Sequence, residues 1–191
     1  MDNKHVPFKQ SRIFVTPILL FITGTITAFL PDVNWWFLAI NLSLCVASGV
    51  AYYFLWRRFN KQSKRYFSLM SYIMLVVMGI HTALPFLRAV YGTVAFVLGI
   101  IIVLLMIALP HIHLEKIAFG VLNHSKSRGG KLVFLFIGAI FLLAPFVFFS
   151  TRTLSEKAMV PVLTFMLLIG LFFLLIAPIM LVKPDRVEEM K

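Results

Sequence analysis

Within the apolar part of the chain, His81 and Arg88 are the ionisable residues whose types and spacing best suit a functional site. They lie seven positions apart, so on a helix both side chains face the same way. As a pair they could form a gate or an anion contact at the outer mouth of a membrane protein. The simpler interpretation is a histidine hydrogen-bonded to a neighbouring helix and an arginine that extends to lipid head groups. We favour the simpler interpretation, because lone histidines in membrane helices find partners on other helices.

Small polar residues form two further stripes at helical spacing. One stripe lies on the first expected helix and the other on the second, and their members are Thr16, Thr23 and Thr27, then Asn41, Cys45, Ser48 and Tyr52. Stripes of this kind join helices through hydrogen bonds that contribute roughly 0.5–2 kcal/mol each. The alternative is that they line a cavity for an uncharged polar solute. The candidate wall residues of that cavity are Thr23, Thr27, Asn41, Ser48, His81 and Arg88.

Other chemistries lack the residues that they need. Cys45 is the only cysteine, which excludes an internal disulfide, a paired-cysteine redox site and a thiolate metal cage. No Gly-x-Ser-x-Gly motif of a hydrolase occurs. His111 and His113 could share a metal only on an extended backbone, and Glu115 is the sole nearby carboxylate. We therefore expect no catalytic residue, no metal, no haem and no other cofactor.

The elements that must position these residues have an unusual composition. The chain has 191 residues, of which 61% are hydrophobic and 13% charged, whereas a soluble domain is nearer half apolar and a quarter charged. Continuous apolar runs of about 20 residues are typical of transmembrane helices, not of alternating barrel strands. We expect one all-α transmembrane domain over 1–191, with six helices paired as three hairpins. The six runs, which contain no Asp, Glu, Lys or Arg, are about 13–30, 35–56, 67–87, 91–109, 132–149 and 158–182.

Positively charged residues predict the orientation of these helices. With a cytosolic N-terminus, the inner segments hold fifteen of the eighteen lysines and arginines, and the outer loops hold only Arg88, Arg152 and Lys157. We therefore expect a multi-pass protein of a bacterial cell membrane with both termini in the cytosol. The lipid bilayer is its first partner, with anionic lipid at the cytosolic face. Nucleic acid is not expected as a partner, because the basic residues lie between apolar runs.

Two local patterns refine this architecture. Apolar residues at 114, 117, 118, 121 and 122 share one helical face, which predicts a short cytosolic interfacial helix over 114–122. An unstructured loop is the alternative, because Gly120 weakens a helix. A glycine followed by a proline also recurs in the first helix of each expected hairpin, as Gly24 and Pro31, Gly79 and Pro85, and Gly138 and Pro145. This recurrence fits either a threefold repeat or the general frequency of both residues in membrane helices.

The chain lacks carboxylates within its apolar runs, which argues against proton- or sodium-coupled transport. We expect a non-catalytic membrane protein that acts as an accessory, stress-response or complex-forming component. A second copy of the chain or another membrane protein would be its partner. The alternative is a transport component, such as a small permease or a six-helix substrate-binding subunit for an uncharged polar solute. A cavity bordered by at least three of the candidate wall residues would favour transport.

Overall fold

The computed structural model describes residues 4–122, 128–151 and 156–189, and within them the chain is helical and forms no strand. The all-α fold expected from the sequence is thereby confirmed. The stretch between the expected helix over 114–122 and the fifth expected span, and the loop before 158, fall partly outside the described residues. The elements in chain order are η1 (Phe8–Gln10), α1 (Val15–Ala28), α2 (Trp35–Phe59), α3 (Ser63–Ala89), α4 (Val94–Ile112), α5 (Leu114–Leu122), α6 (Arg128–Thr151), α7 (Glu156–Ile176), η2 (Ala177–Leu181) and α8 (Pro184–Glu189).

Local sequence explains where the first two long helices begin. The apolar run starts at residue 13, but α1 begins only at Val15, because Arg12 has a φ of 59°, which interrupts a right-handed helix. Asn34 caps the start of α2. Its side-chain oxygen Oδ1 accepts hydrogen bonds from the backbone N–H groups of Trp36 and Phe37, at 3.0 and 3.3 Å.

Other helix ends depart from the apolar runs for equally local reasons. α3 begins at Ser63, ahead of the run at 67, because lysine and arginine support a helix as well as apolar residues do. The final run divides, since α7 ends at Ile176 and continues as the tighter helix η2, which contains Pro178. A proline there cannot donate a backbone hydrogen bond. The predicted short helix is present as α5 with the expected bounds.

Five helical segments are long and apolar enough to cross a membrane: Phe8–Ala28, Trp35–Phe59, Ser63–Ala89, Val94–Ile112 and Met159–Leu181. In the described part of α6 the apolar stretch is shorter and covers Val133–Pro145. The structure thus supports five of the six expected spans by length and composition.

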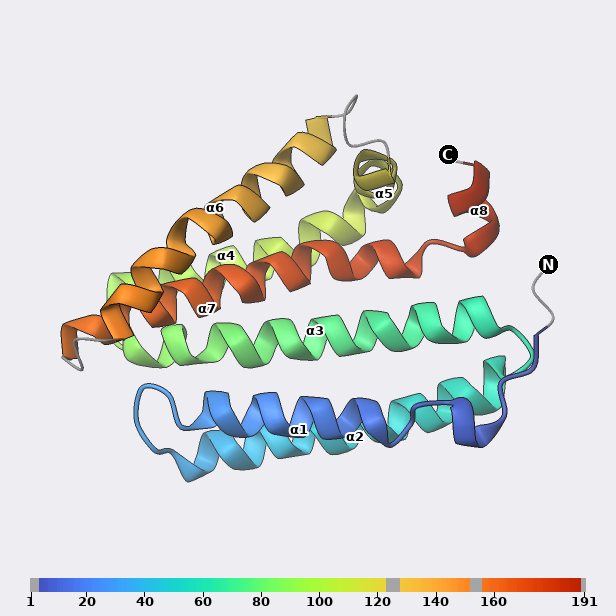
Figure 1. Ribbon diagram of the computed structural model, residues 1–191, viewed down its shortest axis with the longest axis horizontal. Helices are drawn as coiled ribbons and strands as arrows, with labels where there is room; N and C mark the ends of the chain where they lie inside the picture. The colour runs from blue at the N-terminus through green and yellow to red at the C-terminus, as the bar shows by residue number, and fades with distance from the viewer. Residues whose placement is uncertain (1–3, 123–127, 152–155, 190–191) are drawn as a thin grey trace.

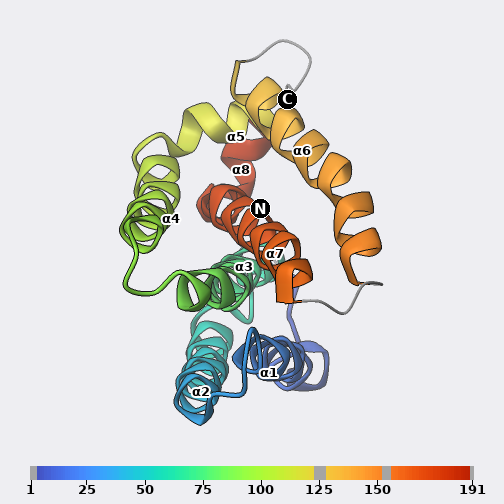
Figure 2. The same cartoon turned by 90° about the vertical axis from the view of Figure 1, so that its left-hand side faces the viewer.

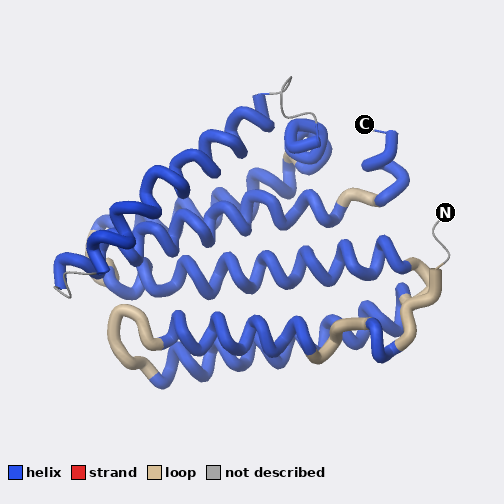
Figure 3. The backbone as a smooth tube through the Cα atoms, viewed as in Figure 1, coloured by secondary structure: helices blue, strands red, loops and turns tan. Residues whose placement is uncertain are grey.

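The helices are arranged around a central pair, α3 and α7 (Figure 1). α1 and α2 lie together against one side of α3, while α4 and α6 lie on opposite flanks of α7 (Figure 2). Short loops join neighbours in sequence (Figure 3). α1 packs on α2 and α6 on α7, but α3 packs mainly along α7 and makes few contacts with α4. The predicted grouping into three tight hairpins is therefore not confirmed.

The N-terminal segment helps to close one end of the molecule, where the α2–α3 turn, α5 and both described chain ends also lie (Figure 1). The backbone N–H of Val6 donates to the carbonyl oxygen of Asn60 at 2.7 Å, and the indole N–H of Trp56 donates to the carbonyl oxygen of Val6 at 3.0 Å. The hydroxyl of Tyr66 donates to the carbonyl oxygen of Ser11 at 2.7 Å. These bonds tie the segment before α1 to α2 and α3.

Candidate functional site

Three of the predicted polar residues, Thr27, Asn41 and His81, meet at Gly24 in α1. A Cβ atom at Gly24 would lie 2.9 Å from Cε1 of His81 in α3 and 3.2 Å from Cβ of Asn41 in α2. A glycine is therefore needed where three helices approach so closely. Nδ2 of Asn41 donates to the carbonyl oxygen of Gly24 at 2.8 Å and to Oγ1 of Thr27 at 3.3 Å. We call Gly24, Thr27, Asn41 and His81 the polar junction.

The polar junction is closed to solvent but leaves several polar atoms without a bond. His81 is 0% exposed and Asn41 is 1% exposed. Both ring nitrogens of His81 and the side-chain oxygen Oδ1 of Asn41 lack a hydrogen-bond partner among the described residues. Among the described residues the predicted hydrogen bond from His81 to a neighbouring helix is thus not formed, and the ring presents its Cε1 edge to Gly24. Each such buried atom costs about 1–3 kcal/mol.

Thr23 and Ser48 do not join this junction. The hydroxyl of Thr23 donates to the carbonyl oxygens of Leu19 and Leu20 in its own helix, at 3.1 and 3.0 Å. The hydroxyl of Ser48 likewise donates to Leu44 at 2.7 Å. Ser48 nevertheless lies on the buried face of α2, and that face consists of the four residues of the predicted stripe. The prediction that Ser48 lies on this face is therefore correct, but the Ser48 hydroxyl forms its hydrogen bond within α2 and not to a neighbouring helix.

Arg88 faces α1, as does His81, which is what their spacing predicts. Nη1 of Arg88 donates to the carbonyl oxygens of Ala28 and Leu30, at 2.8 Å each, and Nη2 donates to the carbonyl oxygen of Asp32 at 3.0 Å. The guanidinium also lies 4.5 Å from the centre of the Phe37 ring. Arg88 therefore binds the orphan carbonyl groups at the end of α1 and holds the 29–34 loop.

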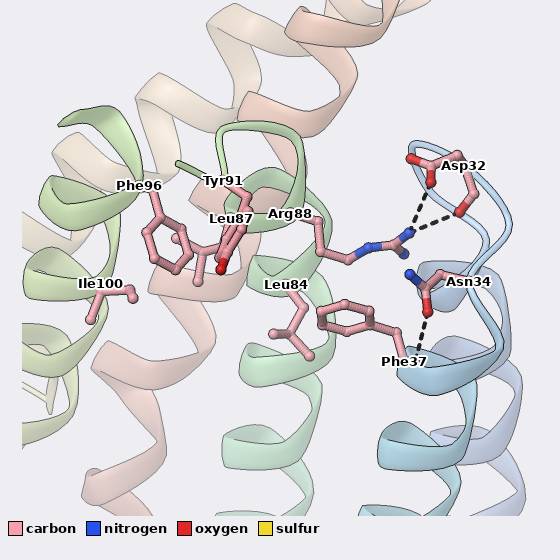
Figure 4. Close-up of a pocket in the computed structure, with 9 residues that line it drawn as sticks. All are labelled: Asp32, Asn34, Phe37, Leu84, Leu87, Arg88, Tyr91, Phe96 and Ile100. Atoms are coloured by element: carbon pink, nitrogen blue, oxygen red, sulfur yellow. Dashed lines mark hydrogen bonds and ion pairs between the residues drawn. The ribbon is translucent and has the colours of Figure 1, made fainter. Parts of the chain in front are cut away.

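A pocket of about 500 Å³ lies beside Arg88 (Figure 4). The α1–α2 loop and the end of α3, which border it, lie at the end of the molecule opposite the termini (Figure 1). Its floor is the last two turns of α3. One wall comes from the start of α2 and the loop before it, and the other from the start of α4 and the turn before it. Of the six candidate wall residues only Arg88 lines it. The lining residues are Asp32, Asn34, Phe37, Leu84, Leu87, Arg88, Tyr91, Phe96 and Ile100.

The polar rim of this pocket combines one buried and one exposed charge. The Arg88 side chain is 8% exposed and the Asp32 side chain 76% exposed, with Nη2 and Oδ2 3.5 Å apart. The sequence analysis did not predict this pocket, although the sequence contains a pattern that indicates it. Asp32 is the only carboxylate between residues 3 and 114, and Arg88 is the only basic residue between 66 and 115. Two such isolated opposite charges, one in the loop after α1 and one at the end of α3, are candidates for an ion pair.

The histidines near the other end serve as packing groups. Nε2 of His111 lies 2.9 Å from the hydroxyl oxygen of Tyr72, and Nδ1 lies 2.5 Å from the carbonyl oxygen of Ile107. His111 thus joins α4 to α3, while His113 follows the end of α4. In the part of the chain that the structure describes, no three His, Cys, Asp or Glu residues are grouped so as to hold a metal.

The described geometry thus offers two distinct polar regions, the closed polar junction and the open pocket beside Arg88. The first can join helices, and the second can receive a ligand. No protein-family model, curated protein sequence or solved structure matches this chain.

Proposed function

We propose that this protein is a non-catalytic, multi-pass component of a membrane complex. The observation that supports this function is the use made of the candidate wall residues. Asn41, His81 and Thr27 are packed together at Gly24, Thr23 and Ser48 bond to their own helices, and Arg88 binds the 29–34 loop. A transport component would instead bring at least three of them to one cavity. Only Arg88 borders the pocket described above.

The proposal includes six spans with both termini in the cytosol. Of the fifteen basic residues assigned to the inner side, thirteen lie among the described residues, and their segments belong to the end with the chain termini, the α2–α3 turn and α5 (Figure 1). That clustering supports a cytosolic assignment for this end. α5 would then lie in the cytosolic interface, near anionic lipid. The sixth span would be α6.

The outer surface of α4 supports a partner within the membrane. This helix has the highest apolar character of the first four and only 11% of its span is buried. Large aliphatic side chains cover its exposed face, including Val97, Leu98, Leu104 and Leu105. In a bilayer such a face contacts either lipid or another apolar helix, and close helix contacts are made where small residues permit them.

Assembly in the native membrane tests this function. The full chain, extracted with a mild detergent, should migrate on a native gel at a mass well above that of one 21.8 kDa copy in its micelle. A photo-crosslinking residue at Leu104 should give a protein adduct, while the same residue at Ile22, exposed on α1, serves as the matched control. Migration as a single copy with lipid adducts alone at Leu104 would contradict the proposal.

A further inference from the structure

The pocket beside Arg88 has the shape and polarity of a site for an amphiphile. Its floor and walls are apolar, from Leu84 and Leu87 on α3 to Phe96 and Ile100 on α4. Its two charged groups, Asp32 and Arg88, lie together with Asn34 at one side, and Tyr91 adds a hydroxyl from the turn before α4 (Figure 4). α2 and α4 flank α3 (Figure 2), so the pocket lies along the outside of α3. A chain of methylene groups fits the apolar part, and a polar head fits the rim.

The approach of α4 to α3 limits the apolar part of this pocket. A Cβ atom at Gly99 would lie 2.7 Å from Cδ2 of Leu87, which itself lines the pocket. The two helices are therefore in close contact at Gly99, next to the pocket residue Ile100. Tyr91 and Phe96 form an edge-to-face pair at the other end, with ring centres 5.1 Å apart. Aromatic residues of this kind prefer the level of lipid head groups.

The rim favours a positively charged head group. The Nη1 and Nη2 groups of Arg88 already donate to three backbone carbonyl oxygens, and its side chain is 8% exposed, so it offers little to an incoming anion. The Asp32 carboxylate is 76% exposed and lies 3.5 Å from Arg88, which leaves most of its surface free to accept hydrogen bonds. An ammonium group can donate to Asp32, and a phosphate beside it would then lie toward the positive charge of Arg88.

We propose that this pocket binds one phospholipid with an ethanolamine head group, with its ammonium on Asp32 and an acyl chain between α2 and α4. This inference rests on the membrane location proposed above, but not on assembly into a complex. An anionic lipid with the same chains and a glycerol head group carries the same phosphate but has no ammonium group to pair with Asp32, so its negative charge is not offset there. The site therefore discriminates by head group and retains the chain through apolar contact.

Native mass spectrometry of the full chain tests this site. The purified protein would be offered an equal mixture of phosphatidylethanolamine and phosphatidylglycerol with identical acyl chains. We expect the ethanolamine lipid to be bound about threefold more than the glycerol lipid, as one partly exposed charge pair allows. Asp32→Asn should bring the ratio close to one. Glu115→Gln removes a distant carboxylate on α5 and should leave the ratio unchanged.

The apolar part of the site has its own matched pair of variants. Ile100→Trp places a bulky ring in the pocket and should reduce bound lipid of both kinds severalfold. Ile101→Trp makes the same change at the next position, which is exposed and does not line the pocket, and should bind as the unchanged protein does. Equal binding of both lipids, a preference for the glycerol lipid, or an unchanged ratio in Asp32→Asn would overturn the inference.

A second measurement separates a failure of the site from a failure of the membrane location. The same variants would be treated with alkaline carbonate in membrane vesicles, which strips peripheral proteins. Retention in the pellet together with lipid binding that ignores the head group refutes this site only. Release into the supernatant refutes both the membrane location and the site.

Discussion

Two helices, α1 and α7, each approach α3 closely at a glycine, and the two contacts differ in the groups that they bring together. At the polar junction, Gly24 of α1 faces the ring of His81 and the side chain of Asn41. At the contact between α3 and α7, a Cβ atom at Gly170 would lie 2.7 Å from the carbonyl oxygen of Gly79 and 3.0 Å from the backbone nitrogen of Ala83. The first contact is between a backbone and side chains, whereas the second brings two backbones together, with Oγ1 of Thr82 2.9 Å from the same added Cβ atom.

This difference shows that a glycine at a helix contact can have two different effects on the fold. A rigid backbone cannot move away from an added methyl group, so the α3–α7 contact tolerates no side chain at Gly170. A histidine ring can rotate, so the contact at Gly24 is more forgiving. The polar junction also leaves buried nitrogen and oxygen atoms unpaired. The α3–α7 contact therefore contributes more to the free energy of unfolding. The polar junction contributes a specific register among α1, α2 and α3.

The largest effect is expected at the backbone contact. Gly170→Ala should destabilise the folded protein by about 3 kcal/mol, because α3 and α7 must separate to admit the methyl group. Unfolding by dodecyl sulfate in mixed micelles measures this change. Gly138→Ala on α6 is the control, since no described atom lies within 4 Å of its added Cβ. That control should be neutral or more stable by up to about 1 kcal/mol. Equal effects of the two variants would refute the contrast.

A smaller loss is expected at the polar junction. Gly24→Ala should cost about 1–2 kcal/mol, because the His81 ring must shift from a site 2.9 Å away. Combining it with His81→Ala should recover part of this cost, which a double-mutant cycle detects as coupling. Gly49→Ala is the matched change on α2, where the nearest atom is Cγ of Pro17 at 3.5 Å. Additive effects of Gly24→Ala and His81→Ala would show that the ring does not limit the contact.

The smallest effect separates the two polar side chains of the junction. His81→Leu removes two unpaired buried nitrogens and should leave the free energy of unfolding within about 1 kcal/mol of the original. Asn41→Leu removes the bonds to Gly24 and Thr27 and should cost about 1–2 kcal/mol more than His81→Leu does. The same micelle titration compares them. A larger loss for His81→Leu than for Asn41→Leu would mean that the ring is bonded in the membrane.

The sequence predicted which residues share a helix face better than it predicted which helix packs against that face. Helical spacing correctly placed Asn41 and Ser48 on one buried face, and His81 and Arg88 toward the same neighbour. It could not show that the neighbour is α1, because helices that are apolar all round do not reveal which side they bury. For the same reason hydropathy did not reveal that α3 packs along α7 and makes few contacts with α4.

The recurring glycine and proline pattern shows this limit clearly. Gly24 and Gly79 both lie in tight contacts, whereas Gly138 faces open space among the described residues. The three positions thus differ in packing although they look alike in sequence. The pocket was not predicted for a related reason, since Asp32 in the 29–34 loop and Arg88 in the last turn of α3 are 56 residues apart and meet only through the fold. Spacing within one helix carries no information about such a meeting.

Solvent access to the buried candidate wall residues tests the central claim most directly. In a chain with Cys45→Ala, which removes the only native cysteine, Thr27→Cys and Ser48→Cys would each place a thiol at a buried candidate wall position. Val33→Cys, in the exposed loop before α2, is the positive control. Intact membranes would be treated with a small charged thiol reagent, which reacts only with a thiolate in contact with water.

We expect rapid labelling of Val33→Cys and no labelling of Thr27→Cys or Ser48→Cys, because these residues pack helices together. Labelling of both buried positions at a rate close to that of Val33→Cys would contradict this account. It would reveal a water-filled cavity among the first three helices, as a transport component requires.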